Sequence, residues 1–197
     1  MGRHKKFDRD QAVDWVMNEL WRVGYEACSV KYISEKLGIT RSSFYNAFES
    51  REVLFFEVLH RYFSLSPDRK LSQCTAEKRP LVLLCKVFKE ICRVRANDPE
   101  HRGCLAVNSI AELVGVNEVL GPPLEAAIEQ SISRFEDILN YSISQGELSP
   151  DHDTRSLALA VQNLLIGINT LSKVIQSEAQ LWASTEVTLR ALGIFRE

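Results

Sequence analysis

The sequence predicts an all-α protein of about nine helices. Apolar residues recur three and four positions apart along most of the chain, the spacing that places them on one face of a helix. No segment shows a convincing alternation of apolar and polar residues, which would be typical of a half-buried strand. Residues that cap helices stand before the apolar runs, and glycine or proline separates many of them.

Four helices are predicted in the first third of the chain. Each begins after a side chain that can accept a hydrogen bond from the first turn; these are Asp8, Ser29, Thr40 and Ser50. Gly24 and Gly38 suit the ends of the first two helices. The third helix is short and ends near Phe48, whereas the fourth continues to about Phe63.

Five further helices are predicted beyond a polar segment. Residues 64–79 are polar and contain a proline, so we expect a loop or a frayed helix end there. The apolar spacing then resumes, with proline and glycine between its runs. The predicted helices span about 80–95, 103–113, 121–145, 153–175 and 178–192.

Composition limits the possible functions. A net charge of −2 and 45% hydrophobic residues are ordinary for a globular protein and argue against a general polyanion binder. The apolar run at 157–168 is interrupted by polar residues and a glycine, and the N-terminus lacks the apolar core of a signal peptide, so we expect a cytoplasmic protein without a membrane span. Five scattered cysteines and four scattered histidines lack zinc-ligand spacing, and we predict neither metal nor cofactor.

The segment around the third helix has the chemistry of a DNA contact. Two short helices joined at Gly38 form a possible helix-turn-helix, whose second helix can enter the major groove. Phe44 and Phe48 lie four residues apart and can anchor one face of that helix. Residues 40–48 contain no carboxylate, which phosphates would repel, while Arg41 can bond to both acceptors of a guanine. The basic arm at residues 3–6 can add a backbone or minor-groove contact, or be a solvated tail.

The stretch "GYEACSVKYISEKLGITRSSFYNAFESREVL" resembles the DNA-binding segment of the tetracycline-repressor (TetR) family of transcriptional regulators. The resemblance needs no gaps between Gly24 and Leu54. Two positions depart from the family pattern: Ser42 stands where glycine is common, and Arg51 stands where lysine is usual. The serine leaves the operator sequence open, whereas the arginine keeps the positive charge.

The resemblance implies a homodimeric regulator, expected to be a repressor that a small-molecule inducer releases from double-stranded DNA with a palindromic or near-palindromic operator. Residues 1–53 would form the DNA-binding domain, and residues 54–197 would bind the ligand and dimerise through the last two helices. The residues expected to contact DNA are Ser29, Lys31, Thr40, Arg41, Ser42, Ser43, Tyr45, Asn46 and Arg51.

The ligand pocket can be predicted only in outline. "HRGCLAVNSIAEL" at 101–113 resembles a signature of some members of the family. Helical spacing puts Cys104, Asn108 and either Ala111 or Glu112 on one inward face. The residues expected at the pocket are Phe63, Phe88, Cys92, Cys104, Asn108 and Phe135. An alternative is redox or electrophile sensing by Cys104, because a thiol at a helix N-terminus is more reactive. The other interpretation of Cys104 is a packed apolar residue.

A different class of protein is also compatible with the sequence. A small helical enzyme or carrier of hydrophobic ligands could contain a helix-turn-helix without regulatory DNA binding. The sequence shows no Ser-His-Asp, metal or phosphate-loop arrangement that would support catalysis, so we predict that the protein is not an enzyme.

Overall fold

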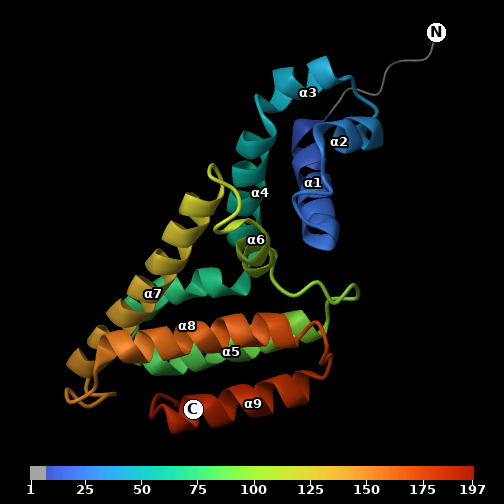
Figure 1. Ribbon diagram of the computed structural model, residues 1–197. Coiled ribbons are helices and arrows are strands. Elements are labelled where there is room, and N and C mark those ends of the chain that lie inside the picture. Colours follow the sequence, from blue (N-terminus) through green and yellow to red (C-terminus); the bar gives the residue numbers. More distant parts are fainter. Residues whose placement is uncertain (1–7) are drawn as a thin grey trace.

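The computed structural model describes residues 8–197, so the basic arm at residues 3–6 lies outside the described part. Within that part the chain forms nine α-helices and one 3₁₀ helix and no strand, which confirms the all-α prediction (Figure 1). The elements are α1 (Arg9–Val23), α2 (Val30–Leu37), α3 (Arg41–Phe48), α4 (Arg51–Leu65), η1 (Pro67–Ala76), α5 (Pro80–Ala96), α6 (Leu105–Leu113), α7 (Gly121–Ser144), α8 (Thr154–Leu171) and α9 (Glu178–Ala191).

Local capping explains where most of the helices begin. The side chains of six N-cap residues each accept a hydrogen bond from the backbone N–H three positions ahead; they are Asp8, Ser29, Thr40, Ser50, Asp153 and Ser177. Gly38 ends α2 with a φ of 67°, a left-handed conformation that costs glycine little. The predicted starts of the first four helices are therefore confirmed.

Two boundaries differ from the prediction. Residues 67–76, expected to be a loop or a frayed end, form the 3₁₀ helix η1, because Leu71 and Cys74 bury their side chains against the core. The eighth helix was expected to reach Ile175 but ends at Leu171, and the chain turns at Ser172, whose hydroxyl bonds to the carbonyl of Asn169.

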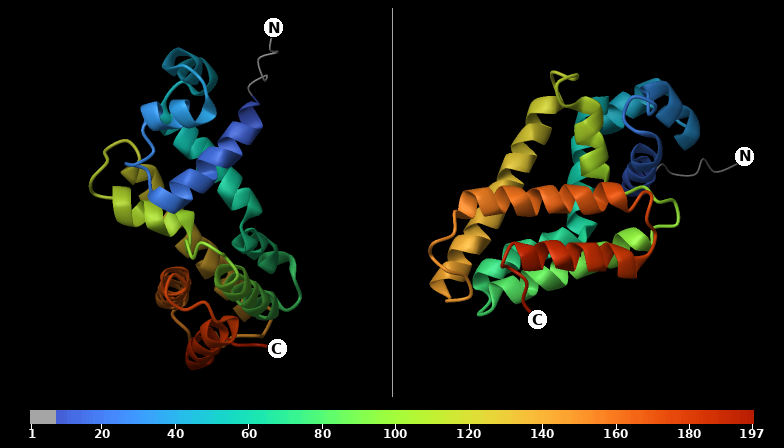
Figure 2. Two further views of the ribbon diagram at one scale, coloured as in Figure 1. Left: turned by 90° about the vertical axis from the view of Figure 1, so that its right-hand side faces the viewer. Right: turned by 60° about the horizontal axis from the view of Figure 1, so that its bottom comes forward.

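The buried residues form two clusters, one toward each end of the molecule. The N-terminal cluster joins α1–α4 to α6 and the start of α7, whereas the C-terminal cluster joins η1, α5, α8, α9 and the rest of α7. Helices α2 and α3 lie at one end of the molecule, and α8 and α9 lie at the other (Figures 1 and 2). Helix α6 therefore packs with the N-terminal helices although it follows α5 in the chain.

No helix within residues 8–197 combines the length and the apolarity that crossing a bilayer requires.

Candidate nucleic-acid interface and ligand pocket

Helix α3 is fixed to the protein by its two phenylalanines. Phe44 and Phe48 are 0% and 1% exposed, and their ring centroids lie 5.3 Å apart. The turn before the helix is held by the N–H of Ile39, which donates to the carbonyl of Ser34 at 3.0 Å. Burying one face of so short a helix leaves its other face and its N-terminus in solvent.

The outward face of α3 carries side chains that were predicted to contact DNA. Arg41, Ser42, Ser43, Tyr45 and Asn46 are all exposed, and half of the Tyr45 surface is open to solvent. Thr40 is also exposed, but its hydroxyl already bonds to the N–H and the hydroxyl of Ser43. The structure thus brings six of the nine predicted DNA contacts together on one tip, with no carboxylate among residues 40–48.

The other three predicted DNA contacts, Ser29, Lys31 and Arg51, lie outside α3 and differ in how far their side chains are already bonded within the protein. Ser29 caps α2, and its hydroxyl accepts the N–H of Tyr32. Lys31 is well exposed and makes only a long ion pair with Glu35 at 3.9 Å.

Arg51 makes contacts within the protein. Its guanidinium carbon lies 3.7 Å from the centre of the Tyr25 ring, its Nη2 atom pairs with Glu26 at 3.4 Å, and only 21% of its side chain is exposed. Stacking of a guanidinium on an aromatic ring stabilises both groups when water is excluded. In this conformation Arg51 therefore holds the turn between α1 and α2, and its contact with a phosphate stays a prediction.

A mainly apolar cavity of about 300 Å³ lies between α4, α6, α7 and α8. This volume is at the lower end of the range for small-molecule sites. The residues that line the cavity are Phe56, Leu59, His60, Phe63, Asp68, Cys104, Ala106, Val107, Ile110, Pro123, Leu124, Ala127, Ile128, Ser131, Gln162, Leu165 and Asn169.

Two of the six residues predicted for the ligand pocket, Phe63 and Cys104, line this cavity. Phe88, Cys92 and Phe135 do not: they are at most 1% exposed and belong to the C-terminal cluster. The aromatic ring of Phe88 packs against that of Phe135, and the Cys92 thiol lies 3.4 Å from the Thr185 hydroxyl. Aromatic and thiol side chains on helices fill cores as readily as pocket walls, which is why their spacing misplaced them.

Cys104, Asn108 and Glu112, which were expected on one inward face, have different surroundings in the structure. Cys104 is the N-cap of α6 and has an extended backbone, so its side chain leaves the helical register and faces the cavity. Asn108, the sixth predicted residue, instead donates to the Arg102 carbonyl and accepts from Lys173 on another side of α6.

A buried chain of polar groups lies behind the cavity. Arg95, only 4% exposed, donates to the Asn169 amide oxygen at 2.6 Å and to the Tyr62 oxygen at 2.7 Å. Tyr62 donates in turn to the Cys104 sulfur at 3.2 Å. Burial raises the pKa of the Tyr62 hydroxyl well above its usual value, so this group keeps its proton and its role as donor.

The C-terminal end of α6 is hydrogen-bonded to the turn between α1 and α2. The two carboxylate oxygens of Glu112 accept the backbone N–H groups of Tyr25 and Glu26, at 2.9 and 2.8 Å, just after Gly24. A β-carbon on Gly24 would lie about 2.9 Å from that carboxylate, so the chain approaches α6 closely there. Helix α6 therefore touches the cavity at one end and the turn before α2 at the other.

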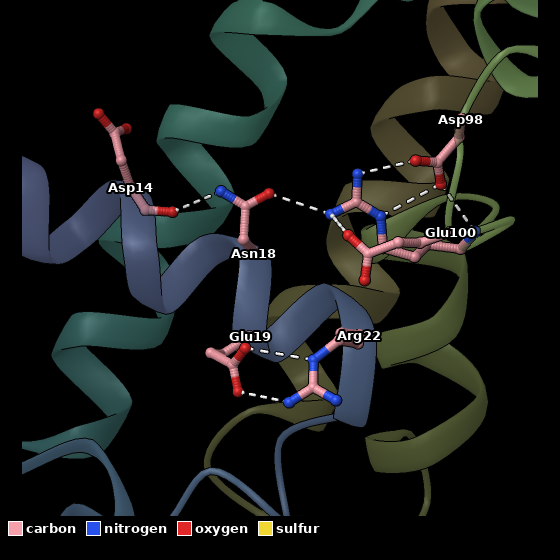
Figure 3. Close-up of polar contacts among 7 residues, drawn as sticks. Asp14, Asn18, Glu19, Arg22, Asp98 and Glu100 are labelled. Atoms are coloured by element: carbon pink, nitrogen blue, oxygen red, sulfur yellow. Dashed lines mark hydrogen bonds and ion pairs between the residues drawn. The ribbon is translucent and has the colours of Figure 1, made fainter. Parts of the chain in front are cut away.

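A second connection runs through Arg102, just before α6. Its guanidinium pairs with Asp98 at 2.8 Å and donates to the side-chain oxygen of Asn18 in α1 at 3.0 Å (Figure 3). It also lies 4.1 Å from the centre of the Trp21 ring. The segment before α6 is thus bound to the C-terminal end of α1. The residues that Glu112 holds follow that end directly in the chain.

Comparison with known proteins identifies the family. Residues 17–58 match the model for bacterial regulatory proteins of the tetR family, and residues 80–186 match the model for the tetracyclin repressor-like C-terminal domain. The chain belongs to the TetR family. It is a DNA-binding transcriptional regulator, and TetR regulators act as dimers. The predictions of family, fold class and regulatory DNA binding are confirmed.

Three similar proteins extend this result. HTH-type transcriptional repressor ComR of Escherichia coli (strain K12) is 26% identical, over 96% of this chain and 90% of its own. The uncharacterized HTH-type regulator YezE of Bacillus subtilis (strain 168) is 23% identical, over 98% of this chain and its whole length. A cysteine mutant of the TetR-family regulator CifR, complexed with 26-bp operator DNA, is 29% identical and superposes with a TM-score of 0.83, over 96% of this chain and 99% of its own.

Sequence reasoning missed the polar residues that α8 contributes to the cavity. Gln162 and Asn169 stand seven positions apart, two turns on one face of an otherwise apolar helix. Polar side chains at core positions of such a helix are unusual enough to mark a site. That spacing was the available signal, and both residues line the cavity of this TetR-family protein.

Proposed function

We propose that this TetR-family protein is a repressor that binds a palindromic operator through its α3 helices and is released when a small molecule occupies the cavity. The observation that carries the proposal is the exposed, carboxylate-free tip of α3, held by Phe44 and Phe48. CifR at 29% identity binds operator DNA in its solved complex, and ComR is named a repressor.

The roles at the DNA follow from side-chain chemistry. Arg41 opens α3 and donates to the O6 and N7 acceptors of a guanine, while Ser42 and Ser43 offer hydroxyls to neighbouring base edges. Tyr45 and Lys31 bind phosphate oxygens, which fixes the position of the helix without specifying sequence. Residues 1–53 form the DNA-binding domain and residues 54–197 the ligand-binding and dimerisation domain, with α4 continuous across the boundary.

Dimerisation uses the outer face of α8 and α9. This face exposes Leu159, Leu171 and Val187, at 46%, 42% and 67% of their surface. Gly167 has nothing within 4 Å of where a β-carbon would stand, so a second helix can approach closely there. Helices α8 and α9 lie at the end of the molecule opposite α3. A dimer formed there with its two-fold axis along the length of the molecule presents both α3 tips on one side, to successive major grooves roughly 34 Å apart.

The exposed valine on α9 gives a test of the dimer. Val187→Asp places a charge at the centre of the proposed interface, and we expect the protein to become monomeric and to bind a palindromic operator at least about 100-fold more weakly. Light scattering after gel filtration measures the mass. Val116→Asp, at an 80%-exposed valine before α7, is the matched control and should remain dimeric. A dimeric Val187→Asp protein would place the interface elsewhere.

Release follows from the position of α6. Ala106, Val107 and Ile110 line the cavity, and Glu112 at the far end of the same helix holds the turn before α2. A ligand that binds better when α6 is displaced shifts the population toward conformers whose α3 tips no longer fit one duplex. Operator binding by the ligand-free protein should be tight and should weaken steeply with salt, as phosphate contacts require.

A second candidate function is sensing of electrophiles or oxidants by Cys104. The observation that favours it is that this thiol lines the cavity at the N-terminus of α6. Other thiols are held inert: burial raises the pKa of Cys28 to about 11 and that of Cys74 to about 12. These two stay protonated near neutral pH, where the thiolate is the reactive form.

Substituting the thiol tests this candidate. If Cys104 is the sensor, Cys104→Ser should bind the operator as the parent protein does but keep it bound in the presence of peroxide or N-ethylmaleimide. Cys28→Ser, at a cysteine outside the cavity, is the control and should still be released. Release of Cys104→Ser by these reagents would leave Cys104 as a packing residue only.

A further inference from the structure

Besides His60 of α4, two groups of polar side chains line the cavity, and they differ in how well their hydrogen bonds are satisfied. Cys104 and Asn169 are satisfied by the buried chain through Tyr62 and Arg95, and the Asn169 amide nitrogen also donates to the Leu165 carbonyl. The second group is Asp68 of η1, Ser131 of α7 and Gln162 of α8, which we call the polar cluster.

The members of the polar cluster are neighbours. The Ser131 hydroxyl donates to the Gln162 Oε1 atom at 2.7 Å. Asp68 and Ser131 both also line a second, more polar pocket that adjoins the cavity and is bordered by Arg69 and Arg134. The cluster therefore stands where the apolar cavity meets this polar vestibule.

Asp68 lacks a partner for its buried oxygen. Its Oδ1 atom is shielded from solvent and has no hydrogen-bond partner among the described residues, nor does the carboxylate form an ion pair with any of them within 4.0 Å. Nearly all buried polar atoms in native proteins are hydrogen-bonded, so an orphaned carboxylate oxygen in a cavity wall marks the place of a missing donor.

Gln162 offers the complementary group. It is 5% exposed, and its Oε1 atom is occupied by the Ser131 hydroxyl. Within residues 8–197 its amide nitrogen has no hydrogen-bond acceptor, and Gln162 borders the cavity. The cavity thus presents an unpaired acceptor at Asp68 and an unpaired donor at Gln162.

These two requirements select a chemical class. A hydroxyl is the smallest group that donates to a carboxylate and accepts from an amide. An ammonium group cannot accept, an ionised carboxylate cannot donate and is repelled by Asp68, and a hydrocarbon leaves both protein groups unpaired. Apart from His60 and the satisfied pair Cys104 and Asn169, the other walls are apolar, with side chains such as Phe56, Ile110 and Leu165.

We propose that the effector of this cavity is a compact, mainly apolar alcohol whose hydroxyl lies against Asp68 and Gln162, an inference that rests on the proposed role of the cavity in release. Its apolar body fills the space between α4, α6 and α8, and its polar end faces the vestibule. The polar cluster sets the head group, and the apolar walls set the size.

A series of probes with one body and four head groups tests the proposal. Titration calorimetry on the full-length dimer compares 3-phenylpropan-1-ol, 3-phenylpropylamine, 3-phenylpropanoate and propylbenzene. We expect the alcohol to bind at least about 10-fold more tightly than each of the others, because each leaves a buried group unpaired or repelled. Equal affinities, tighter binding of the carboxylate, or no binding of any probe would overturn the proposal.

Two variants locate the effect. Gln162→Met removes the donor at similar volume and should reduce the affinity for the alcohol to that for propylbenzene. Asp68→Asn removes the negative charge and should strengthen binding of the carboxylate. Gln145→Met and Asp151→Asn, at exposed positions outside the cavity, are the matched controls and should leave all four affinities unchanged. Unchanged head-group preference in both cavity variants would also overturn the proposal.

The same experiment separates this inference from the proposed function. A gel shift without any probe measures operator binding alone, so failure of all four probes would leave that result intact. If the alcohol binds with the expected preference but operator DNA stays bound, the ligand class stands and the proposed release mechanism fails.

Discussion

Replacing Phe44 with alanine is expected to lower the free energy of unfolding of the N-terminal cluster by about 3–5 kcal/mol, the usual cost of removing a buried phenylalanine ring. Phe44 is fully buried and its ring packs against those of Phe48 and Tyr45. Because these contacts position α3, operator binding should be lost together with the stability. Urea denaturation followed by tryptophan fluorescence measures this, since Trp15 and Trp21 pack against the same cluster.

An exposed residue on the same helix supplies the control for Phe44. Asn46→Ala changes α3 without opening a cavity, and its free energy of unfolding should stay within about 0.5 kcal/mol of the parent value. A Phe44→Ala protein as stable as Asn46→Ala, with operator affinity retained, would show that α3 is not held by its phenylalanines.

Replacing Glu112 with alanine is expected to loosen the turn between α1 and α2. Its carboxylate accepts the N–H groups of Tyr25 and Glu26, and hydrogen bonds to a charged group are worth about 1.5–3 kcal/mol each. The amide hydrogens of Tyr25 and Glu26 should therefore exchange with solvent at least about 10-fold faster in the variant. Hydrogen exchange followed by NMR or mass spectrometry gives these rates.

Two further variants make the Glu112 test specific. Glu112→Gln keeps one acceptor oxygen and should restore part of the protection, whereas Glu118→Ala removes an exposed carboxylate beyond α6 and should change nothing. Unchanged exchange at Tyr25 and Glu26 in Glu112→Ala would rule out this carboxylate as the link between α6 and the N-terminal helices.

Local features of the fold were predictable from the sequence. Thr40 and Ser50 cap α3 and α4 as expected, because an N-cap bond involves residues only three positions apart. Phe44 and Phe48 are buried as expected, because a four-residue spacing fixes a shared helix face whatever the partner is. The exposed character of Arg41 and Tyr45 follows directly from that face.

Features that depend on distant contacts were less predictable. Residues 67–76 looked polar enough for a loop, yet Leu71 and Cys74 dock onto the core and order a 3₁₀ helix. The stacking of the Arg51 guanidinium on Tyr25 was not expected, because the fold brings these two residues together from separate segments. Neither contact can be recognised from the spacing of residues within one segment of the sequence.

The cavity shows the same division between local and distant information. Cys104 lies at the start of a helix and in the cavity wall, a position that the glycine before it and the apolar run after it indicated. Phe88 and Phe135 were misplaced because spacing shows that a residue faces inward but not whether it meets a cavity or another ring. Gln162 was the informative residue, since a polar group on the inward face of an apolar helix needs a partner.

The central claim is that α3 reads bases through Arg41. The most direct test is to measure the affinities of the parent protein and of Arg41→Ala for the selected operator and for its single-base-pair variants at one salt concentration. We predict that Arg41→Ala loses about 1–3 kcal/mol on the parent operator and no longer discriminates at one base pair. Lys31→Ala should instead weaken binding to all sequences about equally. Equal losses on every sequence from Arg41→Ala would contradict the account.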